Sequence, residues 1–144
     1  MEGKANLDAK IAHLGFIQGV IDRMGSNSFL LKGWSVTLVA AVFALSSKDA
    51  DQRFILLAYF PVIVFWTLDA YFLHQERLFR KLYEKVASDL ISSEKFVLNT
   101  SIVRDEVASV SKVFFSNTLF LFHGLIVGVV SIVILVMFCL SKVK

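Results

Sequence analysis

The sequence predicts an all-α membrane protein with three transmembrane helices, an amphipathic N-terminal helix and a cytoplasmic antiparallel helix pair, all within one structural unit over residues 1–144. The composition supports this prediction, because 56% of the residues are hydrophobic, whereas soluble domains have about 45–50% apolar residues. Three apolar runs are each long enough for a helix to cross a hydrocarbon core of roughly 30 Å. Periodic apolar stripes outside these runs indicate further helices.

The first two apolar runs, 29–46 and 54–73, are the predicted first and second spans. The connection between them, Ser46 to Arg53, is short and charged, so the two spans are expected to lie antiparallel as neighbours. Burial inside a soluble protein is the alternative for these helices. It is disfavoured because the chain has too little polar surface to cover three of them.

Each of these spans carries one charged residue, Lys32 in the first and Asp69 in the second, about one turn inside the end that lies away from the connection. A lone charge at the centre of a membrane-spanning helix costs about 2.5 to 3.5 kcal/mol, and two opposite charges at one depth can pair. The sequence therefore predicts a Lys32–Asp69 ion pair, within a subunit or between subunits. In the alternative interpretation, Lys32 extends to the headgroups and Asp69 faces water. Trp34 and Trp66 also match in depth, which is typical of an interfacial aromatic belt.

The N-terminal segment 5–26 has the pattern of an amphipathic helix, with an apolar residue every three or four positions. The stripe consists of Leu7, Ile11, Leu14, Ile17, Ile21 and Met24. This helix is expected either to lie on the membrane surface or to pack against other cytoplasmic helices, and its balanced charge favours packing. The segment Gly25 to Ser28 is expected to break or bend the helix before the first span, and a serine or asparagine within it is expected to cap that span.

The polar segment 74–112 is expected in the cytoplasm. Because no helix breaker follows the second span, a single helix is predicted from about Phe54 to Phe96, with a turn at Asn99 to Ser101. A second apolar stripe predicts the returning helix of an antiparallel helix pair; it consists of Val103, Val107, Val110 and Phe114. Pro61, inside the second span, is a candidate kink, either as a packing feature or as a gating point.

The third span is predicted over 113–140. One face of it carries small residues that let another helix approach closely; they are Gly124, Gly128 and Ser131. Asn117 is expected near the depth of the predicted ion pair, as a residue that hydrogen-bonds between helices. His123 is expected further in, near the midplane, where it either hydrogen-bonds inside a helix bundle or lines a water-filled path.

The distribution of lysine and arginine predicts a cytoplasmic N-terminus and an outside C-terminus, since cytoplasmic segments near membrane spans are enriched in both residues. In this orientation the lysines and arginines on the outside are only Lys48, Arg53, Lys142 and Lys144. The opposite orientation would place most of the positive charge outside.

No constellation of catalytic residues stands out. The three histidines, His13, His74 and His123, have no metal-ligand partner three or four residues away, and neither a Gly-rich phosphate loop nor a nucleophile elbow is present. The single cysteine, Cys139, excludes an internal disulfide and a cysteine-based metal site. The net charge of +3 fits membrane topology better than nucleic-acid binding. We therefore expect no enzyme activity, no cofactor, no metal and no specific nucleic-acid partner.

Two segments resemble a widespread group of small bacterial membrane proteins: FIQGVIDRMGSNSFLLKGW, from Phe16 to Trp34, and FWTLDAYFLHQERLFRKLY, from Phe65 to Tyr83. The general layout is also similar to small two- and three-span membrane effectors and accessory proteins of anti-phage systems. Those families act by membrane disruption or depolarisation after a cytoplasmic sensor has fired. The resemblance implies a multi-pass protein of the bacterial inner membrane with a role in phage defence, and it assigns no functional residue.

Three spans cannot enclose a channel in one subunit. The first functional hypothesis is therefore a homo-oligomer that forms a pore or perturbs the membrane when a sensor protein acts on its cytoplasmic helices. The candidate lining or latching residues are Lys32, Asp69, Asn117 and His123, and the expected partners are the lipid bilayer, further copies of the chain and the sensor. A passive anchor or scaffold for a cytoplasmic partner is the alternative. A small transporter is a third hypothesis, disfavoured because no inverted repeat is evident.

Overall fold

The computed structural model describes residues 2–46 and 52–143, and every regular element within them is helical. In chain order the elements are α1 (Glu2–Ser46), the 3-10 helix η1 (Gln52–Ala58), α2 (Tyr59–Ala87), the 3-10 helix η2 (Thr100–Glu106), α3 (Val110–Phe114) and α4 (Asn117–Val143). The connection 47–51 lies outside the described residues. Among the described residues, three helical stretches are long and apolar enough to cross a membrane, namely Gly3–Ser46, Ile55–Ala87 and Asn117–Cys139. The predictions of an all-α fold and of three such helices are confirmed.

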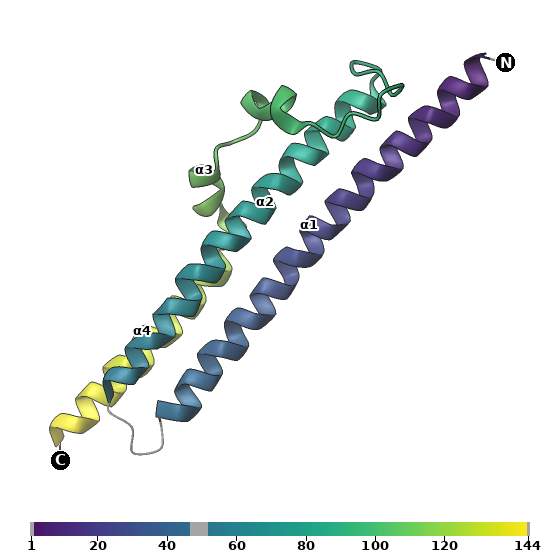
Figure 1. Ribbon diagram of the computed structural model, residues 1–144. Helices are drawn as coiled ribbons and strands as arrows, with labels where there is room; N and C mark the ends of the chain where they lie inside the picture. The colour runs from purple at the N-terminus through teal and green to yellow at the C-terminus, as the bar shows by residue number, and fades with distance from the viewer. Residues whose placement is uncertain (1, 47–51, 144) are drawn as a thin grey trace.

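Helices α1 and α2 lie side by side in opposite directions, and α4 runs along α2 (Figure 1). The N-terminus lies at the same end of the molecule as the segment between α2 and α3, and the C-terminus lies at the opposite end (Figure 1). The end that holds the N-terminus and the segment between α2 and α3 is called the N-terminal end below. Three antiparallel spans would have this arrangement, with the polar parts of α1 and α2 on one side.

Helix α1 continues without a break through Gly25 to Ser28, so the predicted break before the first span is wrong. A glycine inside a helix costs only about 1 kcal/mol relative to alanine, and packing on both sides of this segment offsets that cost. Ile17 and Ile21 are buried before it, and Val39 is buried after it. Ser28 does not cap a new helix, because α1 continues through it; its hydroxyl group donates to Asp69 of α2 instead.

Three apolar clusters join the helices along the length of the molecule. Near the N-terminal end, α1, α2 and η2 meet at Ile17, Ile21, Leu78, Leu82, Val86 and Val103. In the middle, α2, α3 and α4 meet at Ala70, Val113 and Leu119. Near the other end, the cluster consists of Val39, Ala58, Val62 and Val130. The N-terminal stripe therefore packs on α2 in its second half, whereas Leu7 and Ile11 in its first half are exposed.

Helix α2 ends at Ala87 through a Schellman motif, in which two amides after the helix bond carbonyl groups of its last turn. The amide of Leu90 donates to the carbonyl of Lys85 (2.9 Å), and the amide of Asp89 donates to the carbonyl of Val86 (3.1 Å). Asp89 has a φ of 59°, in the left-handed region that aspartate adopts more readily than most residues. The helix therefore ends without a glycine or a proline.

Lys10 and His13 of α1 hold the chain that follows α2. The Lys10 ammonium group donates to the carbonyl of Ala87 (2.8 Å) and to the carboxylate of Asp89 (2.7 Å). A cation at a helix C-terminus interacts favourably with the helix dipole. His13 is buried, and its Nε2 lies 2.9 Å from the carbonyl oxygen of Val97. These contacts bring α1 and the turn after α2 together.

The segment 74–112 does not form two continuous helices as predicted. Helix α2 ends at Ala87 rather than at Phe96, and the returning segment contains only η2 and the five-residue helix α3. Of the predicted stripe in the returning segment, only Val103 is fully buried. A 3-10 helix has 3.0 residues per turn, so it does not keep residues at a spacing of four on one face.

Two predicted features of the spans also differ in the structure. The third span begins at Asn117 rather than at residue 113, because the helix is interrupted between Phe114 and Asn117. Pro61 lies in the first turn of α2, directly after η1, rather than in the middle of a helix. A first helical turn tolerates proline because its amides have no partner within the α-helix. Pro61 therefore lies just after the change from 3-10 to α-helical geometry, and a kink at this position stays a prediction.

Candidate functional site

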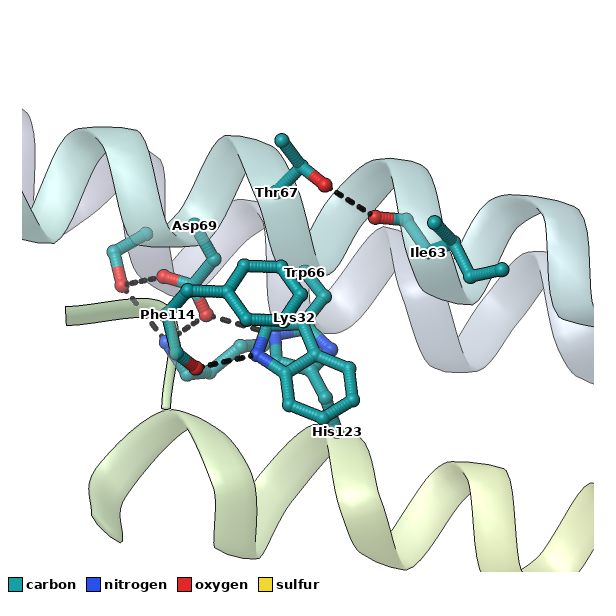
Figure 2. Close-up of polar contacts among 8 residues, drawn as sticks. Lys32, Ile63, Trp66, Thr67, Asp69, Phe114 and His123 are labelled. Atoms are coloured by element: carbon teal, nitrogen blue, oxygen red, sulfur yellow. Dashed lines mark hydrogen bonds and ion pairs between the residues drawn. The ribbon is translucent and has the colours of Figure 1, made fainter. Parts of the chain in front are cut away.

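A polar cluster around Asp69 joins α1, α2 and α4 (Figure 2). The Asp69 side chain is fully buried. Ser28 Oγ donates a hydrogen bond to Asp69 Oδ1 (2.5 Å). At the other carboxylate oxygen, Lys32 Nζ lies 2.6 Å from Oδ2 and His123 Nε2 lies 3.0 Å from it. One carboxylate from α2 thus receives hydrogen bonds from two residues of α1 and one residue of α4.

The two α1 residues of the cluster also contact each other. Ser28 and Lys32 are one helical turn apart and share the face toward α2, and Lys32 Nζ donates to Ser28 Oγ (2.8 Å). The Lys32 side chain is 22% exposed, and its Nζ lies 5.9 Å from the centre of the Phe122 ring, a distance at which a cation is attracted to the ring face. The cluster therefore pairs a fully buried carboxylate with an ammonium group at its edge.

Trp66 supports the cluster from the preceding turn of α2. Its ring stacks on Phe114 (centroids 4.7 Å apart, 5° between planes) and on His123 (5.5 Å, 12°). Its Nε1 donates to the carbonyl of Phe114 (3.0 Å). Stacking restricts rotation of the imidazole ring, so it helps to aim Nε2 at Asp69. Trp34, in contrast, is 57% exposed, so Trp34 has the exposure expected of an aromatic belt and Trp66 does not.

Burial of this cluster is costly unless its polar atoms are paired. An unpaired buried carboxylate is strongly unfavourable, and the penalty falls when the group is both ion-paired and hydrogen-bonded. The Asp69 carboxylate meets both conditions, because Oδ2 is paired with Lys32 and bonded by His123, and Oδ1 accepts from Ser28. Within the described residues, His123 Nδ1 is buried and has no hydrogen-bond partner. The imidazole is thus held by Asp69 at one nitrogen only.

The geometry does not support nucleophilic catalysis. In a serine–histidine–aspartate triad the histidine bonds the serine and the aspartate with its two nitrogens. Here Ser28 and His123 both bond Asp69, at different oxygens, so the base is not aimed at the hydroxyl group. Among residues 2–46 and 52–143, no group of three or more histidine, cysteine, aspartate or glutamate side chains is placed to hold a metal ion. The arrangement instead holds opposite charges together between helices.

The structure brings Lys32, Asp69 and His123 together, but it corrects the expected depth of His123. His123 Nε2 lies 3.0 Å from Asp69 Oδ2, and the imidazole ring stacks on Trp66, one turn before Asp69, so His123 lies at the level of the cluster rather than deeper. The interruption before Asn117 shifts α4 relative to the predicted continuous span. Asn117 itself is exposed at the start of α4 and lies outside the cluster.

The two glycines on the small-residue face of α4 have open space beside them within the described residues. A β-carbon added at Gly128 would meet nothing within 4 Å, and one added at Gly124 would meet only the Phe120 side chain, at 3.9 Å. The Ser131 hydroxyl group lies 2.7 Å from the Tyr59 hydroxyl group, which links α4 to α2. The two glycines are therefore free to lie against a helix of another molecule.

Sequence reasoning missed two members of the cluster, Ser28 and Trp66. Ser28 was expected to cap or bend a helix, although it lies four residues before Lys32 and thus on the same helical face. Trp66 was expected to face the membrane interface, although it lies three residues before Asp69. In both cases a spacing of three or four residues from a charged residue indicated that the side chain lies on the same helical face as that charge.

Comparison with protein-family models, curated proteins and solved structures finds no match for this chain. A functional inference therefore has to come from the residues and their contacts. The Asp69 cluster is the strongest basis for it, because ionisable side chains within an apolar helix have a high cost and a specific arrangement.

Proposed function

We propose that this chain is a homo-oligomeric inner-membrane protein that perturbs the membrane, through a pore or a leak, when a signal reaches its N-terminal end. The observation that carries the proposal is the burial of Asp69 with Lys32 and His123 between apolar helices. Ionisable residues in membrane-spanning segments are rare and are functional by default. A passive anchor does not require them.

In this proposal the cluster is a latch between α1 and α2. Ser28 and Lys32 belong to α1 and Asp69 belongs to α2, and both helices run without interruption from the cluster toward the N-terminal end. A displacement of one helix along the other by part of a turn would separate the carboxylate from its partners. The separated charges would then recruit water into the apolar region, since unpaired charges are not tolerated in hydrocarbon.

Further copies of the chain are needed in this proposal because three spans cannot enclose a channel in one subunit. The outward faces of the spans carry exposed apolar side chains, among them Phe29, Val36, Ile63, Leu68, Leu125 and Ile132. The open space beside Gly124 and Gly128 supports close approach of a helix from a second copy. A closed ring of such contacts would surround a path that the released charges could line.

A scaffold for a cytoplasmic partner is the second candidate, and exposed apolar side chains at the N-terminal end favour it. They are Leu7, Ile11, Phe16, Phe96 and Leu98. Contiguous exposed apolar surface commonly marks a protein contact. In the first proposal the same surface would receive the sensor protein.

Reconstitution into liposomes tests the first proposal. Wild-type protein and Asp69→Asn are inserted at equal protein-to-lipid ratios, and release of an entrapped dye and flux of K⁺ are measured. Asp69→Asn weakens the latch, so it should leak several-fold faster than wild type without any partner. Thr67→Val is the matched control, because Thr67 is exposed on the same helix and its hydroxyl group donates to the Ile63 carbonyl of that helix (Figure 2).

The mass of the intact protein–detergent complex decides between the two candidates. A monomer, together with equal and negligible leak from wild type and Asp69→Asn, would refute the pore and leave the scaffold. The role in phage defence that the resemblance implies is tested by plating phage on cells with and without the protein. Protection that Asp69→Asn removes and Thr67→Val retains would support it.

A further inference from the structure

A cavity of about 260 Å³ lies between α2 and η2, together with Asn99, which precedes η2. Helix α2 lines it with His74, Gln75 and Leu78. The facing segment lines it with Asn99, Thr100, Ser101 and Arg104. His74 directly follows the apolar run 54–73, so in a membrane-inserted α2 the cavity lies at the level of the lipid headgroups.

His74 forms the buried wall of this cavity and has unused hydrogen-bonding capacity. Its side chain is 6% exposed, and within the described residues its buried Nδ1 has no hydrogen-bond partner. Buried polar atoms in folded proteins almost always have a protein, water or ligand partner. Because Nδ1 itself has no accessible surface, His74 contributes the buried wall of the cavity, and the contacts with a ligand come from the opposite side.

The charge around the cavity is positive. The guanidinium groups of Arg77 and Arg104 both act electrostatically on His74. Arg104 is exposed, and the residues that line the cavity include no carboxylate. Asn99 adds hydrogen-bond donors to the lining. Its Oδ1 accepts from the Ser101 amide (2.9 Å), so its side-chain NH₂ group is left to donate to a ligand.

A second cavity of about 380 Å³ shares His74 and Arg104 but is less suited to an anion. It extends toward α3 and is also lined by Asp105, Val107, Ser109 and Val110. The Asp105 carboxylate would repel a negative group there. The positive charge of Arg104 is therefore better matched to a ligand in the first cavity.

We propose that the cavity between His74 and Arg104 binds a phosphate group, and that an anionic phospholipid headgroup supplies it. A guanidinium group bonds two phosphate oxygens at once, and the hydroxyl groups of Thr100 and Ser101 are further donors. Pockets for drug-sized ligands measure roughly 300–1,000 Å³, so a cavity of 260 Å³ fits a headgroup rather than a large ligand. Bound phosphate would join η2 to α2 at the membrane surface, whether or not the protein forms a pore.

Native mass spectrometry of the purified full-length chain in mild detergent tests this site. Phosphatidylglycerol and phosphatidylcholine are titrated separately into wild type, Arg104→Gln and Lys95→Gln. Lys95 is exposed at the same end of the molecule and does not line the cavity, so both variants lose one positive charge. Wild type and Lys95→Gln should bind phosphatidylglycerol alike, and Arg104→Gln about tenfold more weakly. Binding of phosphatidylcholine should be weaker in all three proteins.

A second arm distinguishes a lipid headgroup from free phosphate. Melting temperatures are measured in inorganic phosphate and in chloride at equal ionic strength. If phosphate raises the melting temperature of wild type but not of Arg104→Gln, while the two lipids bind equally, the phosphate site is supported and the lipid source is refuted. Equal behaviour of Arg104→Gln and Lys95→Gln toward both lipids and phosphate would overturn the site itself.

Discussion

Lys32 Nζ of α1 lies 2.6 Å from Asp69 Oδ2 of α2, and Ser28 Oγ bonds both groups. The ion pair is therefore part of a network rather than an isolated contact. His123 also bonds the carboxylate, so exchanging the two charges would place an ammonium group beside the imidazole. Neutralising both charges is for this reason a cleaner test of the pair than a charge swap.

A double-mutant cycle with Lys32→Met and Asp69→Asn should show strong coupling. Lys32→Met leaves a buried carboxylate without its cation, and removing one partner of a buried pair costs about 3–5 kcal/mol. Asp69→Asn should cost less, because the Lys32 side chain is partly exposed. The double variant should be about 1–3 kcal/mol more stable than the sum of the single effects predicts. Denaturant unfolding in mild detergent, followed by circular dichroism, measures the four stabilities.

The matched control for this cycle is Lys81→Met with Glu84→Gln, a pair on the exposed part of α2. Exposed ion pairs contribute little to stability, so the two changes should combine additively. Additive effects at Lys32 and Asp69 as well would show that the charges do not stabilise each other.

His123→Phe should destabilise the protein while preserving its stacking. Phenylalanine keeps a ring against Trp66 but removes the Nε2 donor to Asp69, and loss of a hydrogen bond to a charged group costs about 1.5–3 kcal/mol. The melting temperature and the fluorescence of Trp66 should both change. Leu121→Ala is the control, since Leu121 is 76% exposed on the same helix. Equal stability of the two variants would contradict a role for the hydrogen bond.

The Lys32–Asp69 contact was predictable because each residue lies at nearly the same distance from the connection between two antiparallel helices of known rise. The same reasoning failed for His123. Its depth depends on where α4 begins, and the interruption before Asn117 has no glycine or proline to announce it. Helix register after an irregular segment is set by tertiary packing, here in the apolar cluster of Ala70, Val113 and Leu119.

The end of α2 was missed for a related reason. The stretch after Ala87 contains no glycine or proline, and Asp89 occupies the left-handed position that glycine usually takes. Helix α1 shows the opposite error. A break was predicted at the segment from Gly25 to Ser28, but the helix continues through it. Local propensities there differ by about 1 kcal/mol, which the apolar contacts on either side of the segment exceed.

Asp89→Gly should be more stable than Asp89→Ala. Both changes remove the exposed pair with Lys10, but alanine at a φ of 59° is strained by about 1 kcal/mol relative to glycine. Unfolding experiments on the two variants compare these costs directly. The same substitutions at Asp22, within α1, should show the opposite order, because alanine is favoured over glycine inside a helix. If the glycine and alanine variants ranked in the same order of stability at both positions, the Schellman motif at the end of α2 would be contradicted.

Cysteine labelling should place residues 50 and 95 on opposite sides of the membrane. The distribution of lysine and arginine predicts that residue 95 is cytoplasmic and residue 50 is outside. Lys95→Cys and Ala50→Cys are made with Cys139→Ser to remove the native thiol. A membrane-impermeant maleimide added to intact cells should label only the Ala50→Cys variant. Labelling of Lys95→Cys instead would reverse the orientation.

Gly25→Ala should stabilise the protein by about 0.5–1 kcal/mol, because alanine lowers the entropy cost of an unbroken helix. The added methyl group would meet only Glu76 Oε2, at 3.9 Å, which is an ordinary contact. Gly15→Ala is the control, since a β-carbon there meets nothing within 4 Å and the gain should be similar. Denaturant unfolding measures both changes. If Gly25→Ala destabilises the protein while Gly15→Ala stabilises it, α1 bends at Gly25 and does not act as a rigid connection to the Asp69 cluster.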